Sequence, residues 1–153
     1  MKKEELINAF MEFVEERFPE LIEEDKTSFS DGEKYYWLDS DGNVYPSFWE
    51  NDSVDEGRLL IGNIFKTEEE AEFEVERRKI LHELEALGSP FDRGFRNYYL
   101  AFDYFNEEIS IDFRSNLNSC FSNCFFNSKE DAQKAIDKIG EDRIKKYLFG
   151  AED

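Results

Sequence analysis

The chain has 153 residues, 40% of them hydrophobic and 16% aromatic, which is enough for one hydrophobic core and too aromatic for a disordered protein. Its 37 acidic and 19 basic residues leave a net charge of −18, which argues against direct binding to nucleic acid or anionic membranes, because both require Lys and Arg. No apolar run approaches the roughly 20 residues that span a bilayer, and the acid-rich N-terminus is unlike a secretory signal, so we expect one soluble, cytoplasmic domain over 1–153.

The N-terminal segment is predicted to be an amphipathic helix over residues 3–18. Its apolar residues recur at helical spacing, and Pro19 is placed where the helix ends or a short further turn begins. We expect this helix to bury four side chains in the core: Leu6, Phe10, Phe13 and Val14.

Two aromatic runs, 35–38 and 44–49, flank an Asp-Gly turn and predict a β-hairpin. The same segment has the ligand spacing of an EF-hand calcium loop, with weak metal candidates at Asp39, Asp41, Asn43 and Glu50. Val44 stands where that loop requires glycine, and the flanking runs are β-rich rather than helical. The hairpin is therefore the preferred interpretation, with calcium binding as the alternative.

Residues 54–61 are compatible with a short helix or a turn, and residues 62–65 with a third strand. Thr67 and Glu70 form a capping-box pattern at the start of a long helix that ends near Leu87, before Gly88. The early turns of this helix are acidic and the later turns basic, an arrangement that the helix dipole favours.

The second half of the chain repeats this order of elements. An aromatic run at 98–100 begins a second hairpin that turns near Asn106, and a further capping box precedes a helix that ends at Gly140. Phe65 and Phe126 align at an offset of 61 residues, as do Thr67 and Ser128. We therefore predict an α+β fold in which the N-terminal helix is followed by two similar hairpin–strand–helix units, 34–88 and 97–149, with antiparallel sheet packed against the helices. Two unrelated segments that share turn chemistry remain the alternative to an internal duplication.

Residues 54–73 carry a pattern that resembles one found in small, uncharacterised proteins of phages and prophages of Gram-positive bacteria. That pattern is D-x-x-R-x-x-x-G-N-x-F-x-T-x-E-E-A-E-F, and it follows an aromatic strand pair. Here its positions are Asp55, Arg58, Gly62, Asn63, Phe65, Thr67, Glu69, Glu70, Ala71, Glu72 and Phe73. The resemblance is good over 34–80 and loose elsewhere. It implies a phage or mobile-element source and supplies no catalytic residue.

Catalytic chemistry has little support in the sequence. The single histidine, His82, lies in the long helix among acids, and no nucleophile occurs at a recognisable spacing from it. Cys120 and Cys124 are too few for a zinc site, and we interpret them as small apolar residues, with a redox or metal role as the alternative. We therefore predict no catalytic residue, no cofactor and no enzymatic activity.

Small size, strong acidity and many aromatic residues suit a protein that occupies the nucleic-acid groove of a basic, nucleic-acid-binding host protein. Carboxylates along a helix can replace phosphates there, which predicts an inhibitor of a host defence or nucleic-acid enzyme, of anti-CRISPR or anti-restriction type. Alternatives are a structural or accessory phage protein, and a small-ligand-binding protein or enzyme with a cleft between the two units. Acidity that serves only solubility is a further explanation. The candidate partner-binding residues are Asp52, Asp55, Glu56, Glu68, Glu69, Glu72 and Glu76.

Overall fold

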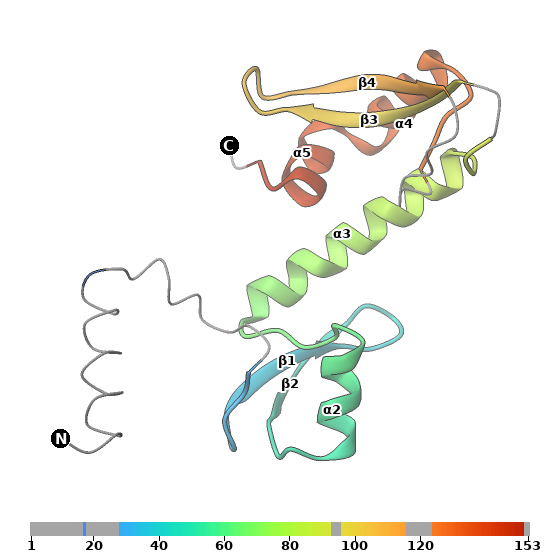
Figure 1. Cartoon of the computed structure of the whole chain (residues 1–153). Coiled ribbons are helices and arrows are strands. Elements are labelled where there is room, and N and C mark those ends of the chain that lie inside the picture. Colours follow the sequence, from blue (N-terminus) through green and yellow to red (C-terminus); the bar gives the residue numbers. More distant parts are fainter. Residues whose placement is uncertain (1–16, 18–27, 93–95, 116–123, 152–153) are drawn as a thin grey trace.

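One long helix, α3 (Glu68–Leu87), joins two groups of elements (Figure 1). The computed structural model describes residue 17 and residues 28–92, 96–115 and 124–151. A first hairpin with a short helix packs near the start of α3, and a second hairpin with two further helices packs near its end. The predicted helix over residues 3–18, with its proposed core residues, falls outside the described residues except for Arg17. None of the described helices is long and apolar enough to cross a membrane.

The first hairpin pairs β1 (Lys34–Leu38) with β2 (Val44–Phe48) in antiparallel register, from Lys34 opposite Phe48 to Leu38 opposite Val44. Its turn is closed by the carboxylate of Asp39, whose Oδ1 accepts hydrogen bonds from the backbone N–H groups of Asp41 and Asn43 at 2.9 and 2.8 Å. This Asx arrangement is the local chemistry by which Asp stabilises turns, and it confirms the predicted hairpin.

The segment after the hairpin contains α2 (Ser53–Leu60), which Asp52 caps by accepting hydrogen bonds from two backbone N–H groups. The predicted third strand is reduced to one isolated bridge, in which Phe65 and Tyr36 exchange two backbone hydrogen bonds of 2.9 Å. The amide of Asn63 continues this pairing, since it accepts from Leu38 N and donates to Leu38 O. A side chain thus replaces what would be the next backbone pair of a full strand.

Helix α3 begins and ends where the sequence predicts. Thr67 Oγ1 accepts a hydrogen bond from Glu70 N at 3.1 Å, which satisfies one unpaired donor of the first turn. The Glu70 carboxylate accepts a hydrogen bond from the N–H of Lys66, the residue before the cap. The helix ends at Gly88.

The second group of elements begins with β3 (Arg96–Asp103) and β4 (Glu108–Ser115), which pair in antiparallel register from Arg96 opposite Ser115 to Asp103 opposite Glu108. Two helices follow, α4 (Lys129–Ile139), capped by Ser128, and α5 (Glu141–Phe149). Phe126 forms an isolated bridge with Tyr98, two residues before the cap of α4, as Phe65 does with Tyr36 before the cap of α3.

The α+β fold class is confirmed, but the predicted antiparallel sheet consists of two separate two-stranded sheets in the described residues. Both groups contain a hairpin, a bridging Phe and a capped helix, whereas Phe65 is half-buried and Phe126 is 1% exposed. The internal duplication stays a prediction.

The main hydrophobic core lies between α3, α4 and α5, under the inner face of the second hairpin. Its buried residues are Ile80, Leu84, Phe126, Ala132, Ala135, Ile136, Ile139 and Ile144. A smaller aromatic cluster holds the first hairpin, where Trp49 stacks on Phe29 and meets the edge of Tyr35. The two clusters lie near opposite ends of α3.

Gly88 lies where the end of α3 approaches the backbone of residue 125 closely. A Cβ added to Gly88 would lie 2.8 Å from the carbonyl oxygen of Phe125 and 3.0 Å from that of Leu84. We expect Gly88→Ala to lower the free energy of unfolding by about 1–3 kcal/mol, measured by urea denaturation, because neither backbone oxygen can move freely. Gly57→Ala is the control: the glycine lies inside α2 with no atom within 4 Å of an added Cβ, so it should raise stability by about 1 kcal/mol. Equal effects of the two variants would contradict this account.

Candidate functional site

The four candidate calcium ligands do not come together. Asp39, Asp41 and Asn43 lie in the hairpin turn, whereas Glu50 lies beyond the other end of β2. The Asp39 carboxylate is already occupied by the turn, because its second oxygen accepts a hydrogen bond from the Asn43 side-chain amide at 3.0 Å. No group of three or more His, Cys, Asp or Glu side chains in the described ranges is placed to hold a metal ion. The arrangement therefore favours the hairpin interpretation over the EF-hand one.

Asp55, a candidate for partner binding, is only 3% exposed, so the structure places it inside the protein rather than on the binding surface. Its Oδ1 accepts a hydrogen bond from the Tyr35 hydroxyl at 2.5 Å, and its Oδ2 accepts one from Glu50 N at 2.7 Å. Arg58 Nη1 donates to the Tyr35 hydroxyl at 2.6 Å, which completes a partly buried chain of hydrogen bonds between α2 and β1. The sequence assignment of Asp55 to the partner surface was wrong, because this carboxylate joins two elements of the fold.

The environment of Asp55 also sets its charge state. Burial raises the pKa of Asp55, but hydrogen bonds from Tyr35 and from the Glu50 N–H, together with the charge of Arg58, lower it below its usual value. The guanidinium of Arg58 lies 3.9 Å from the centre of the Trp37 ring, so aromatic stacking holds it in position. A sequence signal existed for the proximity of the two charges, since Asp55 and Arg58 are three residues apart and face the same side of a helix.

Asp52 and Glu56, the other two candidates from this segment, are exposed on α2. Asp52 has a structural role as the helix cap, and neither residue lines the groove formed by α3. The seven candidates therefore do not line one groove, and only the four acids on α3 do so.

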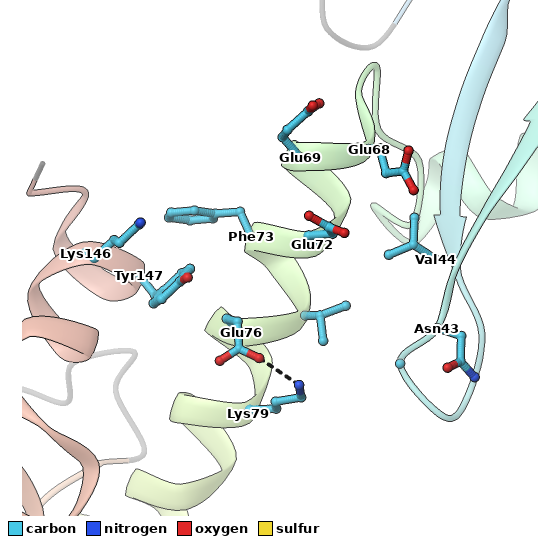
Figure 2. Close-up of a pocket in the computed structure, with 12 residues that line it drawn as sticks. Asn43, Val44, Glu68, Glu69, Glu72, Phe73, Glu76, Lys79, Lys146 and Tyr147 are labelled. Carbon is cyan, nitrogen blue, oxygen red and sulfur yellow. Dashed lines mark hydrogen bonds and ion pairs between the residues drawn. The ribbon is translucent and has the colours of Figure 1, made fainter.

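A groove of about 770 Å³ follows the first turns of α3 (Figure 2). Helix α3 forms its floor, the turn of the first hairpin forms one wall and α5 forms the other. The hairpin turn lies directly against the helix, because a Cβ on Gly42 would be 3.7 Å from Cγ1 of Val75. The groove is lined by Gly42, Asn43, Val44, Glu68, Glu69, Glu72, Phe73, Val75, Glu76, Lys79, Lys146 and Tyr147.

The four acids predicted on α3 all line this groove, but they differ in what they contact. Glu68, Glu69 and Glu72 are exposed, and no ion pair involves them within the described part of the chain. Glu76 accepts from Lys79 at 2.7 Å and from Arg143 of α5 at 3.3 Å. The hydrogen bond from Lys79 is the main reason that the pKa of Glu76 lies below its usual value. Glu76 thus binds α3 to α5, and only the first three acids are available to a partner.

The groove also has an aromatic side that sequence reasoning missed. Phe73 from α3 and Tyr147 from α5 point toward each other, with ring centres 4.9 Å apart, and Val44 lies on the opposite wall (Figure 2). The Lys146 ammonium lies 5.5 Å from the centre of the Tyr147 ring. Nothing in the local sequence indicates that α5 packs beside α3, since the two helices are more than fifty residues apart.

Neither His82 nor Cys124, two of the residues considered for catalysis, lines the groove. His82 is exposed on α3. Cys124 is half-buried against the main core, and burial raises the pKa of its thiol, which disfavours the reactive thiolate. This placement agrees with the interpretation of Cys124 as a small apolar residue, whereas Cys120 lies outside the described residues.

Comparison with known proteins adds no relative: no protein-family model matches the sequence, and neither a curated protein nor a solved structure matches it.

Proposed function

We propose that this protein is a small acidic binding protein that inhibits a basic, nucleic-acid-binding host protein by occupying its nucleic-acid site. The supporting observation is the row of exposed acids on α3, in which Glu68, Glu69 and Glu72 line a groove and have no ion-pair partner among the described residues. Side chains that serve only solubility have no need to gather in one groove, so this arrangement favours a binding role.

The geometry of the row suits a partner that normally binds a phosphate backbone. Glu68 and Glu72, two of the three exposed acids, are four residues apart, which places them about 6 Å apart along the helix axis. A rigid helix presents such charges in a fixed line, and a basic cleft gains both attraction and orientation from it. The net charge of −18 adds long-range attraction to any strongly basic partner.

The resemblance to phage and prophage proteins supports a host enzyme as the target. Host defence and nucleic-acid enzymes in the bacterial cytoplasm carry the basic clefts that this surface would fill. An anti-CRISPR or anti-restriction activity is the form of inhibition that we propose.

The test uses duplex-DNA resin loaded with a lysate of a Gram-positive bacterium at low salt. We expect the protein to elute specific DNA-binding proteins from the resin at low salt, where the resin alone retains them. We also expect its own affinity for the eluted proteins to weaken as salt rises, because exposed charges are screened within about 10 Å at 0.1 M. A Glu68→Lys/Glu69→Lys/Glu72→Lys triple variant should elute none of them, because its row of charges is reversed.

The matched control is an equal charge reversal on other elements, Asp112→Lys/Glu130→Lys/Asp137→Lys. These three acids are also exposed, lie outside the groove and change the net charge by the same amount. The control should elute the same proteins as the wild type. If both triple variants perform equally, net charge rather than the α3 row is responsible and the proposal is wrong for this surface.

A further inference from the structure

The groove combines an acidic surface with an apolar surface, and a site that only imitates phosphates would not need the apolar one. Its acids stand along α3, while Phe73, Val44 and Tyr147 supply apolar surface on the floor and on both walls (Figure 2). Phe73 is 37% exposed although its ring contacts Tyr147, so part of an aromatic face remains open to a ligand.

We infer that the groove binds one protein segment that carries Lys or Arg together with a large apolar side chain. This inference rests on the proposed function and names the part of the partner that enters the site. The basic side chains would reach Glu69 and Glu72, and the apolar side chain would lie against Phe73 and Val44.

The charges in the groove favour a cation without being purely acidic. Four acids line it against two bases, Lys79 and Lys146, and Lys79 already pairs with Glu76. Lys146 lies beside the aromatic side of the groove, near Tyr147. A ligand made only of positive charge would meet Lys146 there, whereas an apolar side chain would not be repelled.

The small contribution of exposed ion pairs to the binding free energy also means that the apolar contact is required. Each ion pair at an exposed carboxylate contributes little to affinity and weakens with salt. Burial of one large apolar side chain contributes more than one exposed ion pair, and aromatic anchors dominate most protein interfaces. The charges would therefore guide the segment, and the apolar side chain would hold it.

The N-terminal segment of this chain is an unsuitable occupant. Residues 1–27 contain four basic and nine acidic residues, a net charge of −5, which the α3 row would repel. Nucleic acid is excluded for the same reason. The sign of the groove thus indicates a different, basic protein.

The experiment titrates the full chain with two synthetic peptides of equal length and equal positive charge. One alternates Lys and Arg with Leu and contains one Trp, and the other has Ser in place of every apolar residue. By calorimetry we expect the amphipathic peptide to bind about tenfold more tightly, a difference of about 1.4 kcal/mol. Phe73→Ser should remove this preference and leave binding of the polar peptide unchanged.

The matched control is Phe105→Ser, which removes a Phe that is 93% exposed and lies outside the groove. It should bind both peptides like the wild type. The Glu69→Gln/Glu72→Gln variant should bind both peptides more weakly than the wild type and should retain the preference for the amphipathic peptide. A thermal melt of each variant confirms that it is folded.

Equal affinity of the two peptides for the wild type, or a preference that survives Phe73→Ser, would overturn the inference. Such a result leaves the proposed function intact if the wild type still elutes proteins from DNA resin in a manner that depends on the α3 row. Failure of that elution contradicts the proposed function itself, so the two failures are distinguishable.

Discussion

Replacing Asp55 by Asn will lower the free energy of unfolding by about 2–4 kcal/mol at neutral pH, because hydrogen bonds to charged groups contribute about 1.5–3 kcal/mol each and losses within one network are not additive. One oxygen of the Asp55 carboxylate accepts a hydrogen bond from the Tyr35 hydroxyl, and the other accepts one from Glu50 N. An Asn side chain has only one acceptor oxygen, because its nitrogen only donates, so it cannot replace both oxygens. Urea denaturation of the two proteins measures the difference.

The loss should depend on pH in a defined direction. The pKa of Asp55 in the folded protein lies below the usual 3.8, so the ionised form stabilises the fold and the full contribution is present above pH 3.8. The contribution then declines as pH falls below 3.8 and through the folded pKa. The stability difference between wild type and Asp55→Asn should therefore be constant from pH 7 to pH 5 and should shrink in more acidic solution.

Asp52→Asn is the matched control on the same helix. Asn caps helices about as well as Asp, so this exposed substitution should change stability by less than about 0.5 kcal/mol. If the two variants are equally stable, or if the Asp55 difference grows as pH falls, the buried hydrogen-bond network does not stabilise the fold in the way described.

Phe126→Ala should destabilise the protein by about 3–5 kcal/mol, the range for truncating a buried aromatic side chain. Phe126 is 1% exposed in the main core, and its backbone also pairs with Tyr98. The substitution removes the ring and leaves a cavity, while the backbone bridge is retained. Thermal and urea unfolding of the variant provide the measurement.

Phe105→Ala, at the tip of the second hairpin, is the control for the loss of a phenyl ring. Its side chain is 93% exposed, so we expect a change within about 0.5 kcal/mol. A loss of less than about 1 kcal/mol in Phe126→Ala would indicate that the core relaxes around the missing ring, contrary to expectation.

Local signals predicted the elements of this fold well. The Asp-Gly turn specified the first hairpin, and Thr67 and Ser128 specified the starts of α3 and α4. In each case the determining residues are within a few positions of the element they control. The predicted strand at 62–65 was reduced to a bridge because the side chain of Asn63 took the place of a backbone pair.

The sequence predicted the site less well because the site depends on contacts between distant segments. Asp52, Asp55 and Glu56 look alike in the sequence, yet only Asp55 meets Tyr35, twenty residues away. Glu76 was predicted as an exposed acid, but Arg143 and Lys79 pair with it. The aromatic wall at Tyr147 was not predictable at all, since it exists only because α5 packs beside α3.

Helix α3 joins two groups of elements, and each group packs around its own cluster of buried side chains. Its buried residues are Ala71 near the first hairpin, and Ile80 and Leu84 in the main core, so none of the eight residues between Ala71 and Ile80 is fully buried. Within this stretch the hairpin turn lies against Val75, and α5 contacts Phe73 and Glu76, so a small bend of the helix there would widen or narrow the groove. A ligand that touches both Val44 and Tyr147 would hold the two groups at one separation.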